Sequence, residues 1–395
     1  MTSDAEGDLS ASATERETVG GQNVGDEEAQ ELLVDLVSIP SPTGEEQEAA
    51  ERLAAFFETH DREVWIDEVG NVRAPGDDSV LLTSHVDTVP GEIPVRVAPQ
   101  EQRDEGGDSE ARRASGRSSG QGPREETAGV LWGRGSVDAT GPLAAMAVAA
   151  VRTGVSFVGV VGEETDSRGA RYLVEDREAP DAVVNGEPSG TDGITLGYRG
   201  FLAGEYTVST DSVHTSRPEA NALQEAMAWW QRLESKFDTT GTYDDTSIFE
   251  QVTAKPVEFS GGTAKDGLSV EATVGVQFRI PPSETAESIQ GLVETELSSG
   301  EVEWAEPIPP VMESPRTEVA RAFRVGIRRV GGDPRLLRKT GTSDMNLYAG
   351  TWDCPMATYG PGDSELDHAP NEHLDLDEFE RATSVLESVA TDLQS

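Results

Sequence analysis

The sequence predicts an α/β protein into which a second, ferredoxin-like domain is inserted. Before about residue 196 and after about residue 310, short apolar runs alternate with stretches of helical periodicity, which is typical of an α/β sheet. Between residues 197 and 309 the order changes to strand, helix, strand, strand, helix, strand, the order of a ferredoxin-like fold. We therefore expect the first domain to be discontinuous, with parts at 27–196 and 310–395.

We expect the N-terminal part to begin with a disordered tail, which is followed by two helices. Residues 1–26 are polar, acidic and without periodicity, which predicts a disordered tail. Helical spacing of apolar residues predicts a helix from Glu27 that ends before Pro40, and Thr43 and Glu46 have the spacing of a capping box for a second helix. Further strands and helices are expected at 80–83, 142–153, 155–161, 167–175 and 181–185.

A second low-complexity stretch, residues 99–127, lacks large aliphatic side chains and predicts a disordered surface insert. In the inserted domain we expect a turn region at Gly261 and Gly262 between the two middle strands. The strands and helices of that domain are expected at 201–210, 220–236, 256–259, 268–279, 283–297 and 302–306. A helix, a strand and a helix are expected after it, at 317–330, 356–359 and 376–393.

The composition is strongly acidic. The chain has 395 residues, with 74 Asp and Glu against 31 Lys and Arg, and a formal net charge of −43. Global electrostatic attraction to nucleic acid or to an anionic membrane is thereby excluded. Such a balance is typical of a halophilic protein, because molar salt shortens the Debye length to about 3 Å and screens the repulsion. An acidic protein from a non-halophile is the alternative.

The cysteine content and the hydropathy of the chain limit the cellular compartments in which we expect the protein. The single cysteine, Cys354, excludes an internal disulfide and a cysteine-based zinc site, so any metal must be held by histidine and carboxylates. No long apolar segment and no signal peptide are found, which predicts a soluble, cytoplasmic protein.

Histidine is scarce, so the position of each of the five is informative. His60 follows a predicted helix and is expected to be solvated, without a role. His85 follows the apolar run 80–83 at the end of a strand, where ligands gather in open α/β sheets. Asp87, two residues further on, could orient the imidazole of a metal-bound His85. A surface histidine beside an aspartate is the alternative.

Three further strand ends carry carboxylates. They are Asp138 after 130–132, the adjacent pair Glu163 and Glu164, and Glu187. An aspartate before a helix is often only an N-cap, but two adjacent acids at a strand end cost stability unless a cation is present. Four strand ends that each deliver histidine or carboxylate predict a site for Zn, Co or Mn, and a bridging carboxylate would allow two metals.

With these motifs the chain, from about residue 27 and without the insert, resembles the zinc-dependent family of acetylornithine deacetylases, succinyl-diaminopimelate desuccinylases and glutamate carboxypeptidases. The resemblance rests on His85-Val86-Asp87, Gly133-Arg134-Gly135-Ser136-Val137-Asp138, Glu163-Glu164, Glu187 and the run 366–372 around His368. It implies a metallopeptidase-type catalytic domain, with residues 197–309 as a lid and dimerisation domain.

The resemblance also implies a metal centre with two Zn²⁺ per subunit, for which Co²⁺ or Mn²⁺ are alternatives. The first ion would be bound by His85 and Glu187, and the second by Glu164 and His368. Asp138 would bridge them. His373, close in sequence to His368, competes for the ligand role but is expected to be a capping or solvated residue.

Catalytic roles follow from the same resemblance. Glu163 would be the general base and Asp87 the partner of His85. His214 would reach the active site of the neighbouring subunit of a homodimer and stabilise the oxyanion. Arg279 would bind a substrate carboxylate. Lys265-Asp266-Gly267 departs from the family, many members of which have an Asn-containing turn there.

Within the family, the chain is more similar to hydrolases that release lysine or ornithine from an acidic amino-group carrier protein. The runs that support this are 87–95, 186–200 and 339–346. The implied function is release of lysine and/or ornithine from the terminal glutamate side chain of the carrier, in lysine and arginine biosynthesis. The alternatives are a small-molecule N-acyl amino-acid deacylase and a non-catalytic metal-binding scaffold, against which the intact Glu163 argues.

A chain this acidic must meet an acidic carrier tail at a local basic strip or through screening by salt. Candidates beside the site motifs are Arg199, Arg217, Arg279, Arg338 and Lys339. Lys339 is expected to bind substrate, and the alternative for Arg338 and Lys339 is pairing with surface acids.

Overall fold

The computed structural model describes residues 22–99, 129–237, 248–265 and 267–395. Most of the expected tail and nearly all of the expected insert at 99–127 therefore lie outside the described residues. Residues 22–26 of the expected tail are packed onto the fold, because Val24 is buried and the Gln22 N–H donates to Val151 O. The first helix, α1, spans Asp26–Ser38.

The larger part is built on a nine-stranded sheet of order β1-β2-β6-β3-β7-β15-β8-β13, in which β14 also pairs with β8. The central strands β6, β3 and β7 are parallel. The strands are β1 Trp65–Ile66, β2 Val72–Ala74, β3 Asp77–His85, β6 Val155–Val160, β7 Val183–Gly186, β8 Gly193–Tyr198, β13 Val311–Met312, β14 Arg335–Lys339 and β15 Met356–Thr358.

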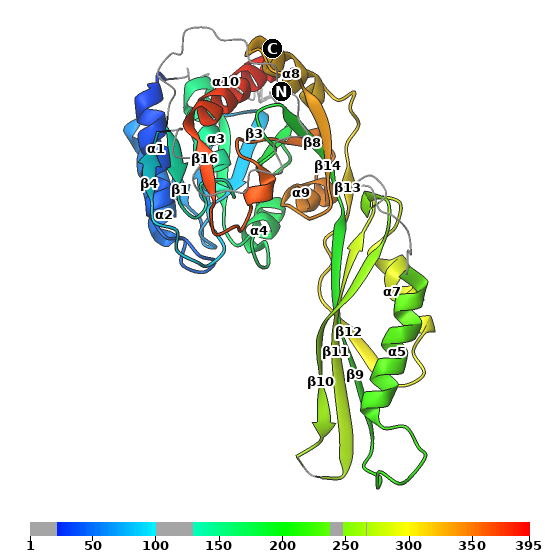
Figure 1. Cartoon of the computed structure of the whole chain (residues 1–395). Helices are drawn as coiled ribbons and strands as arrows, with labels where there is room; N and C mark the ends of the chain where they lie inside the picture. The colour runs from blue at the N-terminus through cyan, green and yellow to red at the C-terminus, as the bar shows by residue number, and fades with distance from the viewer. Residues whose placement is uncertain (1–21, 100–128, 238–247, 266) are drawn as a thin grey trace, which may run out of the picture.

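Helices cover both faces of this sheet (Figure 1). On one face α1, α2, α3, α8 and α10 contribute to the largest apolar cluster, and α3 is buried over nearly its whole length. On the other face α4 and α9 pack on β3, β6 and β7. These helices are α2 Gln47–Thr59, α3 Thr140–Thr153, α4 Arg168–Asp176, α8 Glu318–Arg329, α9 Met345–Thr351 and α10 Leu376–Leu393. A small sheet joins β16 His373–Asp375, β5 Val130–Trp132 and β4 Arg96–Ala98.

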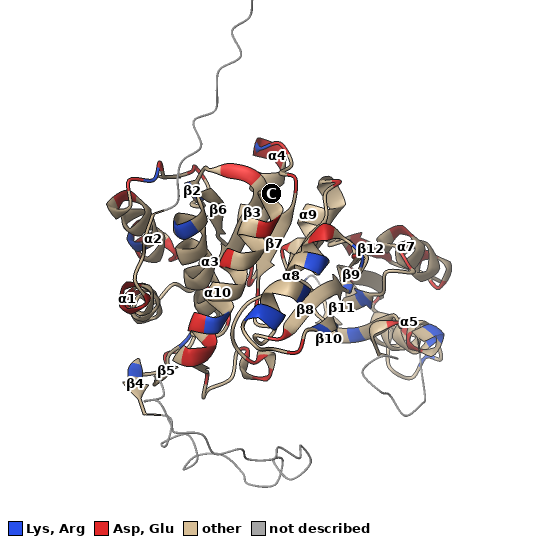
Figure 2. Ribbon diagram, turned by 90° about the horizontal axis from the view of Figure 1, so that it is seen from above, with Lys and Arg blue, Asp and Glu red and all other residues tan. Residues whose placement is uncertain are grey.

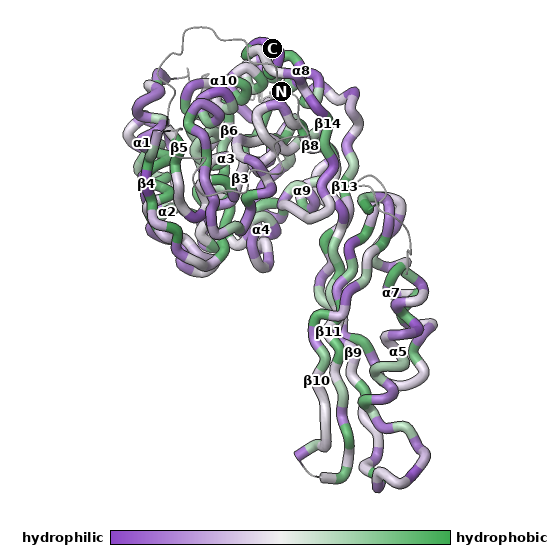
Figure 3. Tube along the Cα trace, in the orientation of Figure 1, coloured by the Kyte–Doolittle hydropathy of each residue, from purple (hydrophilic) through white to green (hydrophobic). Residues whose placement is uncertain are grey.

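The described residues between 200 and 304 form a separate layer, in which a four-stranded antiparallel sheet packs with helices α5 and α7 and projects from the larger part (Figure 1). Buried side chains alternate with more accessible ones along β11, so one face packs on the helices in a cluster of its own. Figure 3 shows hydrophobic and hydrophilic positions along the strands of this layer. The strand order is β10-β11-β9-β12. The elements are β9 Gly200–Asp211, α5 Ala222–Phe237, β10 Thr253–Thr263, β11 Ser269–Ile280, α7 Ala286–Thr295 and β12 Glu301–Trp304.

The turn expected at Gly261 and Gly262 is wrong. Both glycines lie inside β10, where they pair with Glu271 and Ala272 of β11. Their φ angles of 155° and 154° let the strand continue past the position at which a turn was expected. The hairpin closes further on, where the Ala264 N–H donates to Ser269 O. Among the described residues, no helix is long and apolar enough to span a bilayer.

Candidate metal centre

Asp138 lies between two histidines from opposite ends of the chain. Its Oδ1 is 3.2 Å from His85 Nε2, and its Oδ2 is 3.1 Å from His368 Nε2. Each carboxylate oxygen thus faces a different imidazole. This arrangement is what a carboxylate that bridges two cations requires.

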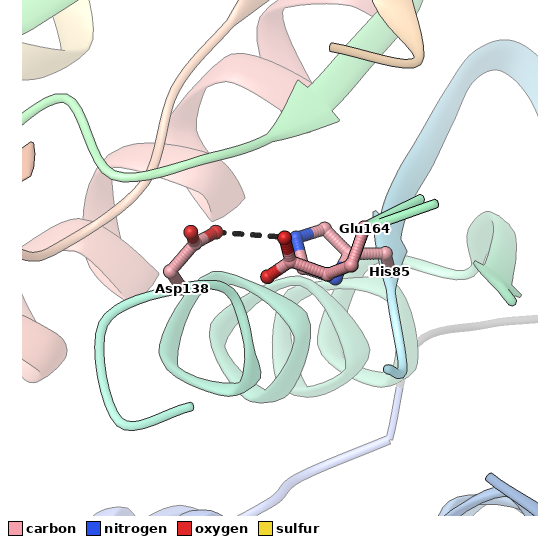
Figure 4. A group of neighbouring side chains, drawn as sticks. All are labelled: His85, Asp138 and Glu164. Carbon is pink, nitrogen blue, oxygen red and sulfur yellow. Dashed lines mark hydrogen bonds and ion pairs between the residues drawn. The ribbon is translucent and has the colours of Figure 1, made fainter. Parts of the chain in front are cut away.

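One further carboxylate stands beside each imidazole. Glu187 Oε2 is 4.0 Å from His85 Nε2, and Glu164 Oε2 is 3.1 Å from His368 Nε2. Ligand atoms of His85, Asp138 and Glu164 all lie within 4.8 Å of one another. Figure 4 shows these three side chains side by side. The five residues expected to be ligands are therefore brought together in two His–carboxylate pairs around Asp138.

The sheet explains why sequence-distant residues meet here. His85 is the last residue of β3, and Glu163 and Glu187 follow the ends of β6 and β7, which flank β3 in parallel. Parallel strands end at the same edge, where ligands bind in open α/β sheets. His368 comes from the loop before β16 and has a left-handed φ of 59°.

Asp87 acts on the turn that carries the two glutamates. Its carboxylate accepts hydrogen bonds from the main-chain N–H groups of Gly162, Glu163 and Glu164, at 2.9 to 3.1 Å. His85 Nδ1 is 2.8 Å from the Asp87 main-chain oxygen and 3.7 Å from its carboxylate. The imidazole is thus oriented by the main chain of Asp87, while the side chain fixes the Glu163–Glu164 turn.

The capping box expected at Thr43 and Glu46 is wrong. Thr43 Oγ1 donates to Asp87 Oδ2 at 2.7 Å, and Glu46 Oε1 pairs with Arg168 at 2.6 Å. Both side chains are drawn to the loops around the site, and α2 has no side-chain cap. The Thr43 hydroxyl therefore supplies a fourth hydrogen bond to the Asp87 carboxylate.

Sequence reasoning missed a link between the two chain segments that form the site. Glu372 is fully buried, and its Oε1 accepts from the N–H groups of Val137 and Asp138 at 2.9 and 3.1 Å. Its Oε2 pairs with Arg134 Nη1 at 2.8 Å. The loop of His368 is thereby tied to the loop of Asp138. Both residues stand in the quoted motif runs, but nothing in their spacing indicates this contact.

Burial and like charge shape the protonation of the site. Burial raises the pKa values of Glu163 and Glu187 well above the usual range, and that of Glu164 to about 7. Burial would also raise the pKa of Asp138, but its hydrogen bonds with His368 and His85 lower it. The hydrogen bond with Asp138 raises the pKa of His368 to about 9. The carboxyl groups of this site therefore cannot all ionise unless positive charge is added.

The donor set fits divalent cations. It consists of two imidazoles and three carboxylates without a thiolate, and Glu164 Oε1 is buried without a hydrogen-bond partner among the described residues. Such nitrogen and oxygen ligands suit Zn²⁺, Co²⁺ or Mn²⁺.

A cavity of about 610 Å³ opens onto the site, lined by Glu163, Arg279, Lys339 and His368 among others. Arg279 Nη1 donates to Thr342 Oγ1 at 3.2 Å, and Lys339 Nζ donates to Pro188 O at 3.2 Å. Both cations that were expected to bind substrate thus face the space in which a substrate would lie.

Two acids beside the cavity were not anticipated. Asp344 is 2 % exposed, and burial raises its pKa to about 7. Asp367 lines the cavity beside His368, and burial raises its pKa to about 8. The only sequence signal was their place in the runs 339–346 and 366–372.

His214 is not brought to the metal centre within one chain. It is exposed and follows β9, whose first residues lie at the cavity and whose last lie at the far tip of the projecting layer (Figure 1). From Phe201 to Asp211 a strand advances about 33 Å. The distance is far greater than a side chain can span.

Three other residues differ from expectation. Arg199 is buried, and its guanidinium donates to main-chain oxygens of Thr340, Ile248 and Gln251, so it has a structural role. His60 is buried with Nδ1 2.8 Å from Phe56 O, and is not solvated. His373, the first residue of β16, is 8 % exposed and stacks on Trp132, so it is not solvated. Arg338, the residue before Lys339, pairs with the exposed Glu250 at 3.2 Å, in agreement with the alternative of pairing with a surface acid.

Comparison with known proteins places this site in a family. The model of peptidase family M20/M25/M40 matches residues 81–392. A LysW-lysine hydrolase of Deinococcus radiodurans is 36% identical over 92% of this chain and 97% of its own length. A LysW-lysine/LysW-ornithine hydrolase of Sulfurisphaera tokodaii is 29% identical over 88% and 91%.

Solved structures share the fold. The aminopeptidase PepT of Bacillus cereus has a TM-score of 0.72 at 18% identity, covering 94% of this chain and 100% of its own. The M20 family metallo-carboxypeptidase Sso-CP2 of Sulfolobus solfataricus has a TM-score of 0.70 at 18% identity, covering 93% and 99%. The family match over residues 81–392 and the 36% identity to the Deinococcus radiodurans relative show that the chain belongs to peptidase family M20/M25/M40.

Proposed function

We propose that this enzyme hydrolyses the amide that joins lysine or ornithine to the terminal glutamate side chain of an acidic amino-group carrier protein, in lysine and arginine biosynthesis. The observation that carries the proposal is the Asp138-centred set of two His–carboxylate pairs with Glu163 on the adjoining cavity. The names of the 36% and 29% identical relatives supply the substrate. A cytoplasmic location agrees with a chain that has one cysteine.

Two cations would be held by the five ligands. His85 and Glu187 would hold one, Glu164 and His368 the other, and Asp138 both. Zn²⁺ is the ion we propose, with Co²⁺ or Mn²⁺ as substitutes. Such ions lower the pKa of water and polarise a carbonyl.

The remaining site residues would carry out proton transfer and positioning. Glu163 would accept the proton of the attacking water and then donate it to the departing amine nitrogen, as a general base that becomes a general acid. The hydrogen bonds from Gly162 and Glu163 to Asp87 hold the turn in place. Arg279 and Lys339 would bind the carboxylates of the substrate.

We further propose a homodimer in which His214 serves the neighbouring active site. His214 is too far along the projecting layer to reach its own cavity, and β10, the edge strand of that layer, is exposed along most of its length. An exposed edge of eleven residues is a surface on which a second copy can pair. His214 of that copy would stabilise the oxyanion.

The proposal is tested by amino-acid release from purified lysine and ornithine conjugates of the carrier, compared with acetylornithine and succinyl-diaminopimelate. Each substrate is assayed in low and in molar salt, because the net charge of −43 predicts that folding and activity require salt. We expect the conjugates to be the preferred substrates. Faster cleavage of acetylornithine than of either conjugate would indicate a small-molecule deacylase.

A further inference from the structure

Two stretches of chain connect the projecting layer to the larger part, and they run side by side. The first passes from β8 into β9 at residues 199–200, and the second returns from β12 to β13 through residues 305–310. The Phe201 N–H donates to Ile308 O at 2.8 Å, and the Ile308 N–H donates to Phe201 O at 2.9 Å. Figures 1 and 2 both show α9 on the side of the larger part from which the layer projects. The two connections thus form one joint, which lies next to α9.

Asn346, in α9, binds to both connections of this joint. Its side chain is fully buried, and its Nδ2 donates to Arg199 O at 3.1 Å and to Pro309 O at 2.8 Å. Each connection thus accepts one of the two N–H groups that an asparagine amide can donate. Its Oδ1 accepts from the N–H of Ser343, a residue that lines the substrate cavity, at 2.9 Å. One amide therefore joins both connections to the wall of the cavity.

Arg279 stands directly beyond the joint. It pairs with Phe201 in the ladder of β11 and β9, and its guanidinium carbon lies 4.7 Å from the centre of the Phe201 ring. Its Nη1 donates to Oγ1 of Thr342, the residue before Ser343, at 3.2 Å. These contacts form a closed circuit that runs from Asn346 through the joint to Arg279 and returns through the cavity wall.

We propose that Asn346 is a positioning residue, which fixes the joint and thereby holds Arg279 where its guanidinium can bind a substrate carboxylate. This inference rests on the role proposed above for Arg279. Arg279 belongs to the projecting layer, whereas the candidate metal ligands belong to the larger part, so a small rotation at the joint would displace one from the other. Charge-assisted hydrogen bonds depend steeply on geometry, so such a displacement would weaken substrate binding.

Other contacts cross the joint in less favourable places. Arg171 of α4 pairs with Glu306 at 2.7 Å, but the glutamate side chain is 75 % exposed. Exposed ion pairs contribute little to stability and are screened by salt. The guanidinium of Arg199 donates to Thr340 O at 2.9 Å and to Ile248 O at 3.2 Å, and both acceptors lie outside the second connection. The buried amide of α9, by contrast, bonds to both connections.

The test is a double-mutant cycle on lysine release from the carrier conjugate. Asn346→Asp keeps the size of the side chain and the acceptor for the Ser343 N–H, but a carboxyl group has at most one O–H to donate to the two connections. It is combined with Arg279→Ala, and KM and kcat are measured for the wild type, both single variants and the double variant. Circular dichroism and metal content check that each variant is folded.

The matched control is Asn71→Asp. Asn71 is also fully buried, and its Nδ2 donates to Asp67 Oδ2 and Gly169 O, each at 3.1 Å. Its Oδ1 accepts from the Val161 N–H at 3.1 Å. The control thus removes a buried amide with the same hydrogen-bond pattern, outside the joint.

We expect Asn346→Asp and Arg279→Ala each to raise KM about tenfold, with kcat within about threefold of the wild-type value. In the Arg279→Ala background, Asn346→Asp should change KM by less than about twofold, because the group that it positions is gone. Asn71→Asp should change KM by the same factor in both backgrounds, as a purely structural effect would.

Gly200→Ala perturbs the same joint without altering Asn346, and it keeps the test decisive if Asn346→Asp does not fold. A Cβ on residue 200 would stand 2.6 Å from Ile308 O and 2.7 Å from Pro310 N, so the two connections must move apart. This variant should also raise KM, and its effect should also disappear in the Arg279→Ala background.

Effects of Asn346→Asp and Arg279→Ala that multiply would overturn the inference, as would an unchanged KM in Asn346→Asp. An unchanged KM in Arg279→Ala would overturn both the inference and the role proposed for Arg279. Wild-type enzyme that releases no lysine from the conjugate would instead overturn the proposed function. The cycle would then be measured on acetylornithine, which also carries a carboxylate for Arg279 to bind.

Discussion

Glu163 and Glu164 are adjacent in sequence but differ in their surroundings. Glu164 Oε2 is 3.1 Å from His368, whereas Glu163 has no contact with either imidazole within ion-pair distance among the described residues and faces the cavity. We therefore expect Glu163→Gln to lower kcat by at least about 10²-fold with normal metal content. Glu164→Ala or His368→Ala should lower metal occupancy, as measured by elemental analysis.

His373→Ala is the control for this pair of variants. Its ring stacks on Trp132, away from the two ligand pairs, so the variant should keep both metals. Loss of zinc in Glu163→Gln would contradict the separation of base and ligand.

Glu372 gives a second prediction at this scale, because it acts on the metal site through the backbone. Glu372→Gln weakens the contact with Arg134 and with the loop of Asp138, so we expect metal affinity to fall about 10- to 100-fold in chelator competition. Asp67→Asn is a matched control. Asp67 also accepts main-chain hydrogen bonds and pairs with a buried arginine, Arg73, away from the site.

Both variants should lose thermal stability, but only Glu372→Gln should lose metal affinity. Equal metal affinity in the two would show that Glu372 stabilises the fold without positioning Asp138.

At the scale of elements, the projecting layer yields a prediction about shared active sites. His214→Ala should lower kcat by about 10²-fold or more, as expected for loss of an oxyanion donor. If His214 acts in the neighbouring subunit, mixing this variant with Glu163→Gln and allowing subunits to exchange should restore about a quarter of the wild-type activity, because one of four sites is intact. Heterodimers verified by mass spectrometry that remain inactive would exclude this sharing.

The elements also show how far the sequence could predict the site. His85, Glu163 and Glu187 could be grouped because each stands at the end of a buried apolar run, and parallel strands end at one edge. Asp138 and His368 took their roles from the family resemblance. The contacts that Glu372 makes with Arg134 and with the loop of Asp138 could not be predicted, because they join two loops that are distant in sequence.

Local patterns misled where tertiary contacts decide the outcome. Thr43 and Glu46 have capping-box spacing, but Asp87 and Arg168 offer their side chains better partners. Gly261 and Gly262 suggest a turn, but the long partner strand β11 keeps them extended. His60 stands at a helix end, where a solvated side chain was expected, but it is buried by tertiary packing.

At the scale of the whole molecule, metal removal should make stability depend on pH. Burial raises the pKa values of Glu164 and Asp344 to about 7, whereas such groups titrate near 4 in an unfolded chain. Between these values the folded protein binds more protons than the unfolded one, so its stability falls as the pH rises. His368, with its pKa raised to about 9, acts in the same direction, because its contribution is complete below about 6.5 and is lost as the pH rises through 9.

Bound cations favour ionised carboxylates and neutral imidazoles, so they should remove this dependence. We expect the melting temperature of chelated enzyme to fall between pH 5 and pH 8, and that of zinc-loaded enzyme to change much less. A parallel fall in both forms would assign the effect to general surface charge.

The path of the chain through the metal centre has a consequence for biosynthesis of the enzyme itself. His85, Asp138, Glu164 and Glu187 all precede the projecting layer, whereas His368 and Glu372 follow it near the end of the chain. With the ligands proposed above, a ribosome must therefore complete almost the whole polypeptide before a second cation could be coordinated. Fragments released by premature termination or by cleavage after β14 would keep most of the acids without the second imidazole, and would be inert as hydrolases.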